Sequence, residues 1–85
     1  MKSALLLKPD VVWLQRENYH IVPLNPLHAP VSELAEVIGQ GISACPDSKR
    51  RDFYDVNLTD GWAYIHVRDA AQTVYLVAYS DSVEP

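Results

Sequence analysis

Residues 53–79 read FYDVNLTDGWAYIHVRDAAQTVYLVAY, and this stretch decides the fold. Three strand patterns of alternating side chains follow one another in it, at 53–58, 62–68 and 73–79. Asp60-Gly61 is a strong signal for a two-residue hairpin turn between the first two patterns. The four residues 69–72 connect the second pattern to the third. The stretch therefore predicts an antiparallel meander.

Successive side chains of a strand point to opposite faces of the sheet, so the meander has two unlike faces. The aliphatic face carries Tyr54, Val56, Leu58, Ala63, Ile65, Val67, Val74, Leu76 and Ala78. The other face, aromatic and polar, carries Phe53, Asp55, Asn57, Trp62, Tyr64, His66, Arg68, Thr73, Tyr75, Val77 and Tyr79. Monomers rarely leave so many large apolar side chains uncovered. We therefore expect the aromatic face to be a binding surface.

The lengths of the two turns also predict a register. With Asp60-Gly61 as the turn, the aromatic-face pairs of the first two strands are Asn57 with Tyr64, Asp55 with His66, and Phe53 with Arg68. With the four-residue loop, the pairs of the next two strands are Arg68 with Thr73, His66 with Tyr75, Tyr64 with Val77, and Trp62 with Tyr79. A slip of one residue would turn the aliphatic side chains outward, which supports this register.

A single helix is predicted before the meander, over residues 31–45. Its apolar stripe has the spacing i, i+3, i+4, i+7, i+11 and i+14, at Val31, Leu34, Ala35, Ile38, Ile42 and Cys45. Pro30 suits the start of the helix and Pro46 its end. Gly39 and Gly41 weaken the last turns by roughly 1 kcal/mol each relative to alanine. We expect this helix to pack on the aliphatic face.

The N-terminal part is predicted to be extended. Residues 11–24 have the pattern of a β-hairpin whose three-residue loop is Arg16-Glu17-Asn18, and residues 3–8 form a further strand or the start of a longer one. The alternation allows residues 3–24 either to extend the main sheet or to cover its aromatic face. The predicted fold is one α+β domain over residues 1–85, with an antiparallel sheet of five or six strands in the order β-β-β-α-β-β-β and one helix.

Composition limits the classes of partner. The chain is 48% hydrophobic and 21% charged, with a net charge of −4, which is typical of a globular domain. The acidic balance disfavours nucleic acid, for which Lys49, Arg50 and Arg51 form the one basic cluster. A single cysteine and the lack of a long apolar run predict a cytoplasmic protein without membrane contact.

Several residues are candidates for catalysis or metal binding. A carboxylate beside an imidazole can form a general base, so Asp55 and His66 are a candidate pair, although an ordinary cross-strand contact explains them as well. Cys45 is interpreted as a small buried hydrophobe rather than a reactive thiol. The spacing of His20, His28 and His66 is not that of a metal site, and no motif indicates a cofactor.

The sequence favours a non-catalytic binding or assembly module that acts as a homodimer through the aromatic face. Its predicted binding residues are Asp55, Trp62, Tyr64, His66, Arg68, Tyr75 and Tyr79. One alternative is a small enzyme or RNA-acting protein that uses Asp55 and His66 with Arg50 and Arg51. Another is a structural subunit whose aromatic face is permanently covered in a larger complex.

Overall fold

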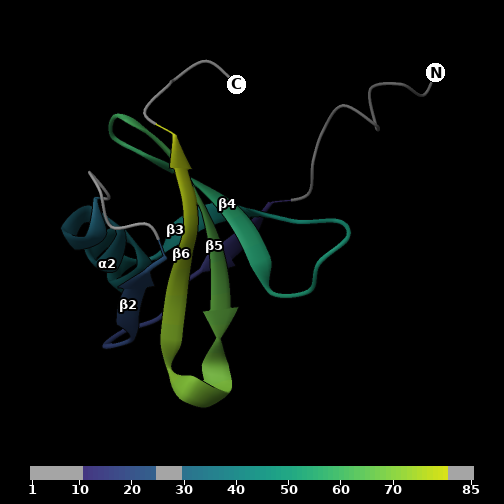
Figure 1. The fold of residues 1–85 in the computed structure, drawn as a ribbon, viewed down its shortest axis with the longest axis horizontal. Coiled ribbons are helices and arrows are strands. Elements are labelled where there is room, and N and C mark those ends of the chain that lie inside the picture. Colours follow the sequence, from purple (N-terminus) through teal and green to yellow (C-terminus); the bar gives the residue numbers. More distant parts are fainter. Residues whose placement is uncertain (1–10, 25–29, 81–85) are drawn as a thin grey trace.

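The computed structural model describes residues 11–24 and 30–80 (Figure 1). Within them lie one α-helix, one 3₁₀ turn and six strands, so the fold is α+β. The elements in chain order are β1 (Val12–Leu14), β2 (His20–Pro23), α2 (Val31–Gln40), β3 (Ile42–Pro46), β4 (Phe53–Leu58), β5 (Gly61–Arg68), the 3₁₀ turn (Asp69–Ala71) and β6 (Thr73–Ser80). The further strand predicted at 3–8 lies outside the described residues.

The six strands form one mixed sheet in the order β1-β3-β4-β5-β6-β2. The meander β4-β5-β6 is antiparallel, as predicted, and β1 and β3 continue that pattern. The prediction of a wholly antiparallel sheet is wrong, because β2 pairs with β6 in the parallel direction. The described N-terminal strands therefore extend the sheet at its two edges.

The predicted hairpin over residues 11–24 is also wrong, since β1 and β2 lie at opposite edges of the sheet. In a flat sheet, five strand spacings would separate these edges by about 24 Å. The six residue steps from Leu14 to His20 reach at most about 20–22 Å. The sheet must therefore curl so that its edges approach each other. The connection passes the end of α2, where the Arg16 N–H donates to the Ile38 carbonyl at 2.7 Å.

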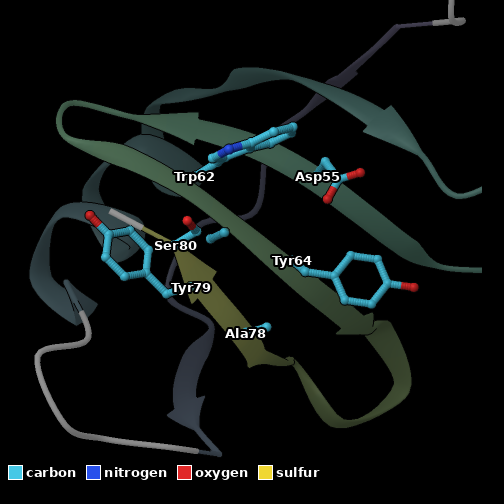
Figure 2. A pocket seen from close by; sticks show the side chains of 7 residues that line it. Asp55, Trp62, Tyr64, Ala78, Tyr79 and Ser80 are labelled. Atoms are coloured by element: carbon cyan, nitrogen blue, oxygen red, sulfur yellow. The ribbon is translucent and has the colours of Figure 1, made fainter. Parts of the chain in front are cut away.

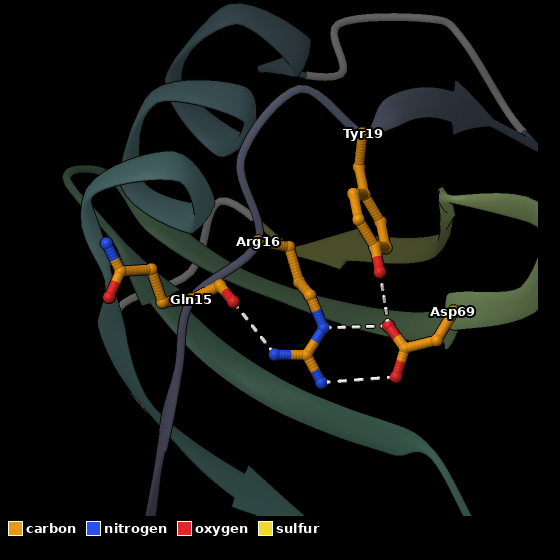
Figure 3. A network of polar contacts seen from close by, with 4 residues as sticks. All are labelled: Gln15, Arg16, Tyr19 and Asp69. Carbon is orange, nitrogen blue, oxygen red and sulfur yellow. Dashed lines mark hydrogen bonds and ion pairs between the residues drawn. The ribbon is translucent and has the colours of Figure 1, made fainter.

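A network of polar side chains holds the connection between β1 and β2 to the 3₁₀ turn that follows β5 (Figure 3). Arg16 Nε lies 2.7 Å from Asp69 Oδ1, and the Tyr19 hydroxyl donates to the same oxygen at 2.7 Å. These hydrogen bonds lower the pKa of the Asp69 carboxyl. The Gln15 side chain donates to the Gly39 carbonyl at 3.3 Å. The chain between β1 and β2 is thus held to both the helix and the turn that follows β5.

The helix is shorter than predicted. It begins at Val31 after Pro30, as expected, but ends at Gln40, and residues 42–46 form β3 instead of its last turns. Gly41 has φ +106°, a backbone conformation that side chains rarely adopt, so the helix cannot continue through it. The apolar residues after Gly41 enter the sheet, where Ala44 pairs with Val56. The helical spacing of Ile42 and Cys45 was therefore coincidental.

The hydrophobic core lies between the helix and one face of the sheet. Leu34 and Ile38 of α2 are almost fully buried in one cluster with side chains from the sheet. The sheet contributes Leu14, Ala44, Val56, Leu58, Ala63, Ile65, Val67, Val74 and Leu76. Burying each of the larger aliphatic side chains stabilises the fold by about 1.5–3 kcal/mol. Seven of the nine residues predicted for the aliphatic face are in this core; Tyr54 is partly buried and packs against it, and Ala78 is exposed.

The register between β4 and β5 differs from the prediction by two residues. Leu58 pairs with Gly61, so the turn residues are Thr59 and Asp60. The predicted pairs of Asn57 with Tyr64, Asp55 with His66, and Phe53 with Arg68 are therefore wrong. A contact remote in sequence explains the shift: Glu33 Oε2 accepts hydrogen bonds from both the N–H and the hydroxyl of Thr59, each at 2.6 Å. A shift of two residues leaves every side chain on its predicted face.

The register between β5 and β6 is as predicted at one end only. Arg68 pairs with Thr73 and His66 with Tyr75 across the four-residue loop, which confirms that half. A β-bulge at Tyr64/Ile65 then shifts the pairing, so that Tyr64 lies opposite Ala78 and Trp62 opposite Ser80. The predicted pairs of Tyr64 with Val77 and of Trp62 with Tyr79 are wrong. Such a bulge adds an unpaired residue to one strand and cannot be read from alternation.

Candidate functional site

The face of the sheet away from α2, here called the open face, runs across all six strands. The register places on it Trp13 of β1, Ser43 and Cys45 of β3, Phe53, Asp55 and Asn57 of β4, Trp62, Tyr64, His66 and Arg68 of β5, Thr73, Tyr75 and Ala78 of β6, and His20 and Val22 of β2. No helix among the described residues covers it, because α2 packs on the opposite face. It includes six of the seven predicted binding residues.

Tyr79 is the exception among the predicted residues. After the bulge it lies opposite Ala63, whose side chain is in the core, and Tyr79 packs against that core. The alternation alone had placed it beside Trp62.

Large exposed side chains on the two edge strands of the open face were missed by the sequence analysis. Trp13 is 65% exposed and Val22 is 38% exposed, and they lie on the two edge strands of this face. Val11 and Leu24, also exposed, continue the same alternation just outside β1 and β2. Of the five large hydrophobic side chains exposed among the described residues, Val12 alone alternates to the other face. The period-two pattern of residues 11–14 and 20–24 indicated which side chains share a face, but not which face of the main sheet they join.

Stacked rings form the centre of the face. Phe53 and His66, directly opposite each other on β4 and β5, have ring centroids 4.1 Å apart and planes only 6° from parallel. His66 also lies 6.0 Å from the ring of Tyr75 on β6. Arg50 places its guanidinium carbon 5.3 Å from the Phe53 centroid, within cation–π range. This row forms a platform of stacked rings on the central strands.

The predicted pairing of Asp55 with His66 does not form. Asp55 lies opposite Tyr64 and His66 lies opposite Phe53, and no hydrogen bond links the two side chains. Without a carboxylate to orient the imidazole, this part of the face lacks the arrangement of a general base.

Tyr64 is held by a carboxylate from the loop after β3. Its hydroxyl donates a hydrogen bond to Asp47 Oδ2, and Asp47 Oδ1 accepts the Lys49 backbone N–H at 2.8 Å. The bond to Tyr64 lowers the pKa of Asp47, and the same bond raises the pKa of Tyr64. The hydroxyl is thus engaged, so Tyr64 presents mainly its ring to a ligand.

The surroundings of Asp55 differ from those of Asp47. Within the part of the chain that the structure describes, its carboxylate makes no hydrogen bond and no ion pair. Burial raises the pKa of the Asp55 carboxyl, and the nearby negative charge of Asp47 raises it further. Asp55 is therefore a half-buried acid on an aromatic surface, without a local donor.

The other residues singled out by sequence have ordinary surroundings. Cys45 is half-buried in β3, where it pairs with Asp55, so its predicted place in a buried helical stripe is wrong. Lys49, Arg50 and Arg51 are exposed in the loop between β3 and β4. Across residues 11–24 and 30–80, no three histidine, cysteine or acidic side chains are grouped as metal ligands, and His28 lies outside these ranges. The described helix is not long and apolar enough to cross a membrane.

Comparison with known proteins gives no family: no family model matches this chain, and neither a curated protein nor a solved structure does. Arguments about function therefore depend on the open face itself.

Proposed function

We propose that this protein is a non-catalytic binding and assembly module that acts through its open face as a homodimer. The observation that carries the proposal is that exposed apolar side chains lie at both edges of this one face, Trp13 on β1 and Val22 on β2, on either side of the stacked rings of the central strands. Exposed patches of this kind mark interaction surfaces in soluble proteins. Tryptophan, tyrosine and arginine, all present here, are enriched among the residues that dominate binding energy.

The arrangement of charge on the face supports a second copy as the partner. The acidic Asp55 of β4 lies beside Tyr64 of β5, whereas Arg68 lies at the C-terminal end of β5. A two-fold axis that crosses the strands would put the acidic region of one copy over the basic end of the other. The ring platform of Phe53 and His66, between these regions, would then lie near the axis. Such a face is complementary to itself in both charge and apolar content.

The enzyme hypothesis has no comparable support, because His66 stacks on Phe53 instead of pairing with Asp55. A cytoplasmic location remains part of the proposal, on the ground that the chain has a single cysteine.

The test is the molar mass of the protein by light scattering after size-exclusion chromatography. We expect the wild type to be a dimer and Val22→Glu to be a folded monomer at the same concentration, because a charge would be buried in the interface. Ala35→Glu places the same acid on the exposed surface of α2 and should remain dimeric. A wild type that is monomeric at every concentration tested would refute the homodimer.

A further inference from the structure

A pocket of about 360 Å³ opens at the Trp62 end of the open face. Its lining includes Asp55, Trp62, Tyr64, Ala78, Tyr79 and Ser80, whose side chains are shown in Figure 2. The volume is at the lower end of the range for small-molecule sites, which suits a single functional group or side chain. The bulge at Tyr64/Ile65 sets its shape, because it brings the small side chain of Ala78 opposite Tyr64.

The walls of the pocket are aromatic and its one charged group is acidic. Trp62 contributes an indole and Tyr64 a ring whose hydroxyl is already bound to Asp47. Asp55 is the directly paired neighbour of Tyr64 and the diagonal neighbour of Trp62 across β4 and β5. Within the described residues, the lining has no basic side chain. The surroundings therefore favour a positive charge and offer it flat π-faces.

Asp55 differs in this respect from the other carboxylates of the meander and its loops. Asp69 is bound by Arg16 and Tyr19, and Asp47 is bound by Tyr64 and a backbone N–H. Both have donors in the chain, whereas the half-buried Asp55 has none among the described residues. A half-buried acid without a donor destabilises the fold, so a donor from a ligand would be strongly favoured.

We propose that this pocket binds the guanidinium group of an arginine side chain. A guanidinium is planar, so it can stack on the Trp62 indole while its edge donates N–H groups to the Asp55 carboxylate. A quaternary ammonium has no N–H to donate, and a lysine ammonium cannot stack in this manner. The inference deepens the proposed binding role of the open face, on which it rests, but it does not require the dimer.

The experiment follows the two tryptophan indole N–H signals in ¹H–¹⁵N spectra during titration with N-acetyl-arginine amide, in the Val22→Glu background, which leaves the open face uncovered if the wild type is a dimer. N-acetyl-citrulline amide, which has nearly the same shape without the charge, is the matched ligand. We expect a saturable shift of the Trp62 signal with the arginine probe, little shift with the citrulline probe, and no shift of Trp13, which lies at the sheet edge outside the pocket. Asp55→Asn should weaken binding about tenfold or more, since it removes a charge-assisted hydrogen bond.

Asp52→Asn is the matched variant. It removes a carboxylate from an exposed position in the loop before β4, at φ +69°, where asparagine is well tolerated. In the Val22→Glu background, it should bind the arginine probe as tightly as Val22→Glu alone does. Equal shifts with the arginine and citrulline probes, or undiminished binding by Asp55→Asn, would overturn the proposal. The pair of ligands tests the charge even if Asp55→Asn were to fold poorly.

Comparing the titration of Val22→Glu with that of the wild type separates this inference from the dimer. Val22 lies on β2, outside the pocket, and its substitution opens the face if the wild type is a dimer. A monomeric wild type that binds the arginine probe would refute the dimer and support the pocket. A dimeric wild type whose Val22→Glu monomer gives no saturable Trp62 shift would support the dimer and refute the pocket.

Discussion

Alanine at Gly41 and alanine at Gly39 should change stability in opposite directions, although the two glycines are only two residues apart. Gly39 is in α2, and a Cβ added there would meet nothing within 4 Å. Alanine is a better helix former than glycine, so Gly39→Ala should stabilise the protein by about 0.5–1 kcal/mol. That gain corresponds to a rise in melting temperature of up to about 4–8 °C for a domain of this size.

Gly41→Ala should destabilise the protein for two reasons. Gly41 has φ +106° and ψ 136°, and holding another residue in such a conformation costs about 1–3 kcal/mol. A Cβ would also lie 2.3 Å from Cζ2 of Trp13, so the indole would have to move. About a third of Trp13 is covered, and losing that contact adds roughly 0.5–1 kcal/mol. The expected total is about 1.5–4 kcal/mol, a large share of the stability of a small domain.

Urea unfolding followed by circular dichroism measures both variants on the same scale. In a Trp13→Ala background, the cost of Gly41→Ala should fall but not vanish, because the backbone strain remains. A Gly41→Ala variant as stable as the wild type, or a change of the same sign for both glycines, would refute the argument about the end of the helix.

Three further predictions concern the core and two carboxylates. Ile38→Ala should lower the free energy of unfolding by about 2–5 kcal/mol in urea, because Ile38 is only 1% exposed. The pKa of Asp69 is lowered by Arg16, so its contribution is present above the ordinary aspartate pKa and is lost as pH falls through the lowered value. Asp69→Asn should thus be less stable than the wild type at neutral pH, and equal denaturation midpoints there would contradict this. The pKa of Asp55 is raised, so its ionisation weakens the fold as pH rises. Asp55→Asn should therefore be more stable than the wild type at neutral pH. In thermal melts, the difference in melting temperature between the two proteins should disappear below the ordinary aspartate pKa.

The sequence pattern predicted the meander because its strands and their order are determined by residues close together in the chain. Alternation assigned the faces of β4 and β5 correctly, and the four-residue loop set the pairing of Arg68 with Thr73. The turn between β4 and β5 was predicted wrongly, because its residue Thr59 is bound by Glu33 of a helix that is remote in sequence. The strand β3 was missed because Ile42 and Cys45 fit helical spacing as well as strand spacing, and Gly41 decides between them through its backbone conformation.

The candidate site, like the fold, was predicted only where local sequence pattern determines it. The aromatic residues of β5 and β6 were placed on one face by alternation, except beyond the bulge, where Tyr79 turned to the core. Trp13 and Val22 could not be assigned to this face from sequence, because their strands join opposite edges through long-range pairing. The isolation of the Asp55 carboxylate depends on the side-chain bonds of Tyr64 and Asp47, which no local pattern encodes.

The most direct test of the open face as an assembly surface uses the intrinsic fluorescence of the protein. The chain contains two tryptophans, Trp13 and Trp62, and both lie on this face. Quenching by acrylamide therefore reports whether the face is covered. We predict weak quenching in concentrated protein and stronger quenching on dilution, with the Val22→Glu variant strongly quenched throughout. Strong quenching of the wild type at every concentration would contradict the proposal that a second copy covers the open face.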